Sequence, residues 1–444
     1  MGFLDTGRLP LSDNIHFAPM QAAVVSLAFC AALLASLGVK FWLATRQMRH
    51  VHQHRDAVPV PFDAVIPLPA HQKAADYTVA RNRFSLLTEA FGVLTLLGWT
   101  LLGGLDLLNG FLRDWIAPHW GGMAYQLALF AGFGLISGLL DLPFEWYRTF
   151  RLEQRFGFNR ITPGLFLADM LKSTLLGAVI GLPLLAAVLW VMAATGTWWW
   201  LWAWGLMVGF MLLMQVLYPT VIAPIFNKFK PLADNELAER VQALMQRCGF
   251  QSRGLFVMDG SRRSAHGNAY FAGMGRAKRV VFFDTLLERL QPAEVEAVLA
   301  HELGHFHHRH VRNRMWTVIA MSGLGMAALG WLAGQAGFYQ GLGVTPNLVD
   351  AQAAPNNALA LLLFMLATPP LMFFVAPLMA HSSRKDEFQA DAYACQQASG
   401  RQLSSALLKL YEDNASTLTP DPIYARFYYS HPPASERLAA LART

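Results

Sequence analysis

The chain has 444 residues, of which 54% are hydrophobic and only 14% are charged, and its mean hydropathy is +0.32. Soluble domains carry about 25% charged residues, so this composition excludes an ordinary soluble protein and indicates a membrane protein. The net charge of +6 also occurs in nucleic-acid-binding proteins, but excess Lys and Arg in a membrane chain more often orients its loops, so we expect no nucleic acid as a partner. The three cysteines, Cys30, Cys248 and Cys395, form no CxxC pair, which argues against a disulfide scaffold or a thiolate zinc site.

Seven stretches are apolar enough to cross a bilayer, for which roughly 20 mostly apolar residues are needed. The sixth stretch is rich in small residues, which lets helices approach one another closely. Pro369, Pro370 and Pro377 predict that the seventh is bent or broken. The predicted spans are about 20–44, 85–108, 123–143, 171–195, 197–218, 315–338 and 358–380.

The distribution of basic residues predicts the orientation of these spans. With the N-terminus outside, the outer segments are 1–19, 109–122, a short turn near residue 196, and 339–357. They contain only Arg8 and Arg113 among the 35 Lys and Arg residues. The positive-inside rule therefore predicts an N-terminus outside and a C-terminus inside. The first span is too long for a cleaved signal peptide, so we expect it to be retained.

Two polar regions lie on the predicted inner side, at about 226–314 and 381–444. In the first, Asp234 or Asn235 caps a helix that Gly249 ends, and Pro292 begins a helix running through Arg309 or beyond. "GLFVMDG" and "RVVFFD" read as strands, with "NAYFAG" as a third. The expected organisation is a membrane domain over 1–225, an inner domain over 226–314, two spans over 315–380 and the rest of the inner domain over 381–444.

The inner region contains "HELGH", an HExxH motif at residues 301–305. Residues i and i+4 share one face of a helix, so His301 and His305 can bind one metal ion, and Glu302 lies where it can accept a proton from water. For His307, His308 and His310 the favoured interpretation is a basic helix end at the lipid headgroups.

The third metal ligand must come from another part of the chain, because one straight helix does not easily supply three zinc ligands. Metzincins break the helix with a glycine and add a histidine, but His308 and Val311 occupy those two positions here. Spacing alone leaves Asp386, Glu387 and Asp391 as competing candidates, beside the simpler reading of a solvated charged turn.

Several segments outside the HExxH motif match motifs of one known family. "SRKDEFQADAYA" resembles its SRxxExxADxxA motif, and "RSAHGNAYFAG" resembles its HSNAYFYG-like substrate segment. The other matching segments, in chain order, are "HQKAADYTVARNRF", "RLEQRFGFNR", "YPTVIAPIFNKFKPL" and "SHPPASERLAAL". From about residue 71 to the C-terminus the sequence is thus similar to the type I CaaX prenyl proteases, integral-membrane zinc metalloproteases with seven spans.

The resemblance implies a fold that is mainly α-helical: seven transmembrane helices around a large internal chamber, with a small α+β zinc-metalloprotease domain on the inner side. It places the third ligand of one Zn²⁺ per chain on Glu387 and a supporting carboxylate on Asp391. It gives His431 the role of donating to the oxyanion in the transition state, and Arg437 that of securing the carboxylate side of the site. The substrate-binding residues that it implies form an edge strand: Asn268, Ala269, Tyr270 and Phe271.

The implied activity is release of the C-terminal tripeptide from isoprenylated peptides, or cleavage of a broader set of membrane peptides. Gly267 and Ala272 replace the family's Ser and Tyr, which bears on side-chain preference near the cleavage site. Alternatives are an HtpX-like quality-control protease, which should have about four spans, and a catalytically dead membrane scaffold. A site-2-type protease is disfavoured because "HHRHVRNR" after the motif is too polar for a membrane interior.

We further expect a monomer in contact with lipid, with a cytosolic active site. The expected membrane is the inner membrane of a bacterium or the endoplasmic reticulum of a eukaryote. Glu89 and Asp141 lie inside predicted spans, where each must pair or face a cavity.

Overall fold

The computed structural model describes residues 21–60, 62–250, 254–272, 279–347 and 355–443. Six of its helices are long and apolar enough to cross a membrane, or up to seven if a bent pair counts as one span. The predicted number of seven spans is confirmed when this bent pair is counted. Of the predicted outer segments, 1–19 and residues 348–354 of the segment 339–357 lie outside the described residues. The spanning elements are α1 (Ala22–Gln53), α2 (Leu68–Trp99) bent into α3 (Gly104–Trp115), α4 (Ala117–Tyr147), α5 (Pro163–Ala194), α6 (Trp199–Leu217), α11 (His310–Leu332) and α13 (Asn357–Met372) continuing as α14 (Ala376–Gln397).

The bend between α2 and α3 differs from the sequence prediction, which placed a loop over 109–122. The two helices are inclined by 45°, and α3 with the start of α4 makes most of that segment helical. Gly103 has a left-handed φ of 80°, and a Cβ on Gly104 would lie 2.5 Å from the Gly98 carbonyl oxygen. Two consecutive glycines thus permit a sharp turn that hydropathy does not reveal.

The seventh span is interrupted, as its prolines predict. Pro369 and Pro370 lie within α13, and the interruption is a short 3₁₀ turn at Phe373–Val375, after which α14 begins with Pro377 in its first turn. Pro377 does not interrupt α14, because proline is tolerated in the first turn of a helix. The helix continues out of the apolar region toward the sheet. It thereby connects the last span to the inner domain.

The inner domain is built around a four-stranded sheet of order β1-β2-β4-β3. β2 (Leu255–Met258) and β4 (Arg279–Phe283) are parallel, while β1 (Phe229–Pro231) and β3 (Ala269–Ala272) pair antiparallel with them. The three predicted strands are confirmed, whereas β1 was not predicted because three residues carry no detectable alternation. The helices of this domain are α7 (Ala223–Phe226), α8 (Asn235–Arg247), α9 (Asp284–Leu287), α10 (Pro292–His307), α15 (Gly400–Asp413), α16 (Pro422–Tyr428) and α17 (Ala434–Leu441).

Local sequence signals set the ends of these helices. The Asp234 side chain accepts a hydrogen bond from the Leu237 amide at the start of α8, and Gly249 follows its end with φ 64°. The helix predicted to run through Arg309 ends sooner, at His307. Arg309 has a left-handed φ of 63°, which separates α10 from α11. The HExxH helix and the sixth span are therefore distinct elements.

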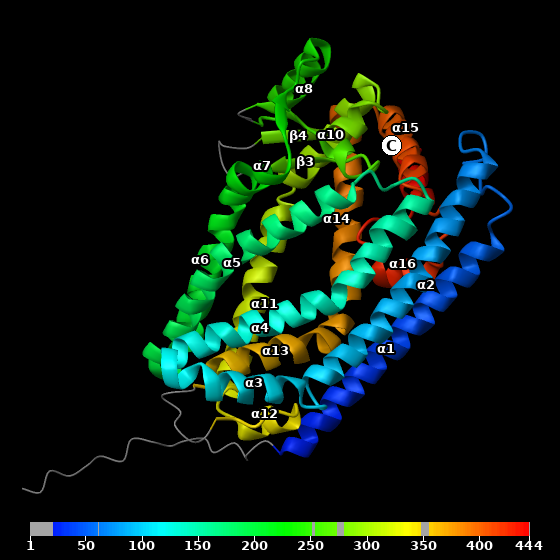
Figure 1. Ribbon diagram of the computed structural model, residues 1–444. Coiled ribbons are helices and arrows are strands. Elements are labelled where there is room, and N and C mark those ends of the chain that lie inside the picture. The colour runs from blue at the N-terminus through cyan, green and yellow to red at the C-terminus, as the bar shows by residue number, and fades with distance from the viewer. Residues whose placement is uncertain (1–20, 61, 251–253, 273–278, 348–354, 444) are drawn as a thin grey trace, which may run out of the picture.

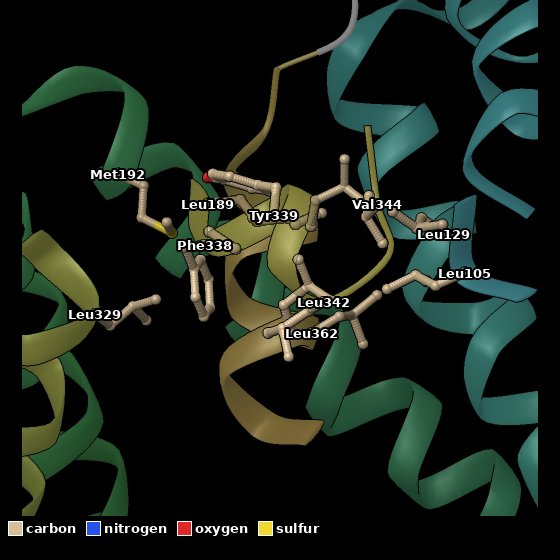
Figure 2. Packing of buried hydrophobic residues seen from close by; sticks show 14 of the residues in the cluster. Leu105, Leu129, Leu189, Met192, Leu329, Phe338, Tyr339, Leu342, Val344 and Leu362 are labelled. Carbon is tan, nitrogen blue, oxygen red and sulfur yellow. The ribbon is translucent and has the colours of Figure 1, made fainter. Parts of the chain in front are cut away.

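Two hydrophobic cores hold the ends of the molecule. One joins α8, β4, α10, α14 and α15 through residues such as Val241, Phe282 and Leu303. The other lies at the opposite end, where the short helix α12 (Ala336–Gly341) contributes Phe338 and Tyr339 to side chains converging from α3, α4, α5, α11 and α13 (Figure 2). Figure 1 shows α3 and α12 at one end and the sheet at the other.

Between these cores the spans pack sparsely. Only 6% to 33% of the residues in their apolar windows are buried, which indicates a ring of helices rather than a solid bundle. Within the ring, Lys40 on α1 and Glu89 on α2 form an ion pair of 2.6 Å, which satisfies one of the two predicted intramembrane carboxylates. Asp141 is exposed and makes no ion pair within the described residues. The fold thus places the inner-domain sheet at one end of these spans (Figure 1).

Candidate metal centre

Helix α10 places the two motif histidines side by side. The helix begins with Pro292 in its first turn and a capping box between Gln291 and Glu294, so its start is fixed. His301 and His305 follow one turn apart, and their Nε2 atoms are 3.3 Å apart. The two imidazoles therefore converge on one point, as their spacing predicts.

Helix α14 packs directly against α10 beside the two histidines, because the residue of α10 at the contact is a glycine and has no side chain. A Cβ added to Gly304 would lie 2.9 Å from the Ala390 Cα and 3.2 Å from the Tyr393 Cβ. Gly304, the glycine of "HELGH", thus allows the backbones of the two helices to come close together. This contact places the acidic residues of α14 beside the histidines.

The structure selects one of the three competing carboxylates as the third candidate ligand. Glu387 Oε2 lies 3.4 Å from His301 Nε2, and Glu387 Oε1 lies 3.3 Å from His305 Nε2. One ligand atom from each of these residues lies within 4.8 Å of the others. Asp386 instead points toward His310, at 3.6 Å. The topology thus brings the chain back to the site after two spans.

The chemistry of these donors fits a metal ion. The Glu387 side chain is 4% exposed, and its Oε2 atom is buried without a hydrogen-bond partner within the described residues. Arg437 Nη1 lies 3.6 Å from this oxygen, which is an ion-pair contact but too long for a hydrogen bond, so a metal ion could still satisfy it. Two imidazole nitrogens and one carboxylate oxygen also form a ligand set that catalytic zinc uses, with a fourth position left open.

Asp391 and Arg437 orient His301 from behind. Asp391 Oδ1 lies 2.8 Å from His301 Nδ1, and the Arg437 Nε donates to Asp391 Oδ2 at 2.9 Å. Burial lowers the pKa of His301, but hydrogen bonds to Asp391 and Glu387 outweigh it and raise that pKa to about 9. With Nδ1 held by Asp391, Nε2 is the nitrogen left to face the metal position. A metal ion binding there must displace the Nε2 proton, so metal affinity should fall as the pH is lowered.

His310 is a site residue that sequence reasoning missed. It was predicted to lie in a basic helix end at the lipid headgroups, and this is wrong, because only 5% of its surface is exposed. Its Nδ1 atom lies 3.1 Å from His305 Nδ1, and its Nε2 lies 2.8 Å from Gln389 Oε1. A metal-binding histidine usually has a partner on its second nitrogen, and this rule was the available signal. His307 and His308 remain exposed.

Glu302 and His431 lie next to the candidate ligands. Burial raises the pKa of Glu302, although the charges of His301 and His305 oppose that effect. His431 follows α16, and its side chain is 62% exposed, with Nε2 3.4 Å from Glu387 Oε1. A raised carboxyl pKa suits a group that must both accept and return a proton near neutral pH.

A cavity of about 710 Å³ opens on this side of the site. His431, Arg437 and Asn268 border it from the inner domain, and Tyr77 and Arg81 border it from α2. Asn268 directly precedes β3, which among the described residues pairs only with β4. The outer edge of β3 is thus available for pairing with an extended peptide.

Substituting Gly304 should separate the two halves of the site. In a Gly304→Ala variant the added methyl group meets the α14 backbone, and such overpacking costs about 1–3 kcal/mol. We expect zinc affinity to fall about tenfold or more, because each 1.4 kcal/mol changes an equilibrium tenfold. Metal analysis after dialysis measures the zinc that remains bound. Gly177→Ala, where the added atom meets nothing within 4 Å, is the control and should keep its metal. Full metal retention by the Gly304 variant would contradict this account of the contact.

Comparisons with known proteins agree with this geometry. Residues 47–228 match the family described as CAAX prenyl protease N-terminal, five membrane helices, and residues 231–444 match peptidase family M48. The CAAX prenyl protease 1 homolog of Oryza sativa subsp. japonica is 34% identical over 88% of this chain and 92% of its own. CAAX prenyl protease 1 of Saccharomyces cerevisiae is 33% identical over 92% and 93%, respectively.

A solved structure extends the likeness to the whole fold. The crystal structure of S. mikatae Ste24p matches with a TM-score of 0.87 at 30% identity, covering 94% of this chain and 99% of that one. The CAAX prenyl protease 1 homolog of Homo sapiens is also 30% identical, over 93% of this chain and 95% of its own. The chain therefore belongs to the CAAX prenyl protease 1 family and is a multi-pass membrane protease of peptidase family M48.

Proposed function

We propose that this membrane protease is a zinc-dependent endopeptidase that releases the C-terminal tripeptide from isoprenylated CaaX peptides. The observation that supports it most is the convergence of His301, His305 and Glu387, whose ligand atoms lie within 4.8 Å of one another beside Glu302. The substrate class rests on the names of the relatives, which are CAAX prenyl proteases from a plant, a yeast and a mammal.

The candidate site residues have separate roles in the hydrolysis. When bound by His301, His305 and Glu387, zinc supplies Lewis-acid polarisation of the scissile carbonyl and activates water at neutral pH. Glu302 takes the proton of the attacking water and returns it to the leaving amine. His431 donates a hydrogen bond to the oxygen on which negative charge develops in the transition state.

Other residues hold these groups and the substrate in place. Asp391, fixed by Arg437, sets the ring orientation of His301, and His310 does the same for His305. The edge of β3, with Asn268 before it, pairs with the extended substrate backbone, so that the scissile carbonyl is carried past the metal.

The proposed topology places this site on the cytosolic side. α1 starts at the end of the molecule opposite to the sheet, and the C-terminus lies at the sheet end (Figure 1). The basic loops lie at the sheet end as well, so the positive-inside rule favours an outer N-terminus and a cytosolic site. We propose that the protein acts as a monomer, since all candidate site residues come from one chain.

Purified protein assayed on a farnesylated CaaX peptide and on its unmodified twin tests the proposal. We expect a single cleavage that releases the C-terminal tripeptide. A chelator should abolish this cleavage and added zinc should restore it, because the metal supplies the coordination position at which water is activated. Mass spectrometry identifies the products. The farnesylated peptide should have the higher kcat/KM. Equal cleavage of both peptides would remove the prenyl requirement and leave a broader membrane protease, and activity insensitive to chelation would refute the metal-dependent mechanism.

A further inference from the structure

The cavity beside the metal centre is positively charged. Among the described residues that line it are two arginines, Arg81 and Arg437, and His431, but no aspartate or glutamate. Its other polar lining consists of neutral hydroxyl and amide groups, several of them from tyrosines on α16 and just after it. Such a lining favours an anionic ligand group, because no carboxylate among the described lining residues repels it.

The two arginines differ in what already binds them. Arg437 is buried against Asp391, and its Nη1 lies 3.6 Å from Glu387 Oε2, so its charge serves the metal centre. Arg81 extends from α2 and is exposed to the cavity. Its guanidinium lies 5.3 Å from the centroid of the Tyr77 ring, and it makes no ion pair within the described part of the chain. Arg81 is therefore the cation of this cavity that has no anionic partner.

Arg81 faces the segment that leads to the catalytic histidine. Burial raises the pKa of Tyr424 and Tyr429, and the nearby charge of Arg81 opposes this effect at both hydroxyls. Tyr429 lies two residues before His431, which borders the same cavity. A peptide that passes His431 into the cavity thus enters the space that Arg81 also lines.

We propose that Arg81 binds the free C-terminal carboxylate of the substrate. This inference rests on the proposed function, in which three residues follow the scissile bond. In extended form they reach roughly 10 Å beyond it and end in a carboxylate. Moving that charge out of water is costly unless a cation pairs with it, and an arginine does so with two parallel hydrogen bonds. The cavity thereby selects a chain end three residues from the cleavage point rather than an internal bond.

Binding of matched peptides to an inactive enzyme tests this role. The probe is a fluorescent farnesylated peptide ending in cysteine, two valines and a serine, made once with a free carboxylate and once as the C-terminal amide. In the Glu302→Gln background, which keeps the ligands, we expect the acid to bind about tenfold to hundredfold more tightly than the amide. Adding Arg81→Gln should reduce the affinity for the acid to that for the amide and leave the amide unchanged. Arg81→Lys should retain part of the preference for the acid, because lysine keeps the positive charge but cannot form the two parallel hydrogen bonds of an arginine.

The matched control is Arg83→Gln, which removes an exposed arginine from the same helix that does not line the cavity. It should keep the full preference for the acid. Equal binding of acid and amide by the Glu302→Gln protein, or an equal loss for both peptides on adding Arg81→Gln, would overturn the proposal, the latter indicating a packing role. Cleavage by the wild-type protein is measured in parallel. Failure to cut either peptide while the acid still binds preferentially would count against the proposed function and leave the carboxylate site standing.

Discussion

Replacing Glu302 with glutamine should lower kcat by about 10²- to 10⁴-fold, the range expected for loss of a general base. Glutamine has nearly the same shape, so the helix and its histidines should stay in place. It cannot accept the proton of the attacking water. Turnover of the farnesylated peptide measures the loss, and metal analysis of the same sample should find one zinc per chain, as in the wild-type protein.

The combination of lost activity and retained metal separates a catalytic role from a structural one. A fall in zinc content would mean that Glu302 supports the ligands instead of acting on water. Unchanged turnover would place the general base elsewhere. A wild-type protein that shows no turnover and a variant that matches it in every measured property would favour the catalytically dead scaffold.

Replacing Glu387 with alanine should remove both metal and activity. The substitution deletes one of three candidate ligands and leaves His301, His305 and Arg437 facing one another without their shared carboxylate. Loss of an outer-shell partner alone weakens metal binding by about 10- to 100-fold, so loss of a ligand should exceed that range. Zinc titration with a competing chelator measures the affinity.

Asp386→Ala provides the matched control, because it removes a carboxylate from the adjacent position. Asp386 faces His310 at 3.6 Å and is not part of the candidate metal group. We expect this variant to bind zinc with near wild-type affinity. If the Asp386 variant lost the metal and the Glu387 variant kept it, the assignment of the third ligand would be reversed.

The part of the site that sequence could predict is the part that local geometry determines. The four-residue spacing of His301 and His305 fixes their proximity once the segment is helical, and Pro292 and the residues after it favour that helix. The seven spans follow from length and hydropathy in the same way. These predictions need no knowledge of how distant segments pack.

The remaining features depend on tertiary contacts. Asp386 and Glu387 are neighbours with similar chemistry, and only the rotation of α14 against α10 at Gly304 decides which one faces the histidines. His310 reaches His305 because the chain turns at Arg309, a residue that adopts a left-handed φ of 63° without being glycine. Sequence patterns signal such turns mainly through glycine or asparagine, so this one gave no warning.

The separation of the candidate ligands along the chain has a consequence for biosynthesis. His305 is made before α11 and α13, whereas Glu387 is made after them and Arg437 later still. Under the proposed ligand assignment, a polypeptide emerging from a ribosome therefore lacks a complete metal site throughout the insertion of its hydrophobic segments. Under that assignment, proteolytic competence arises only when translation is nearly finished.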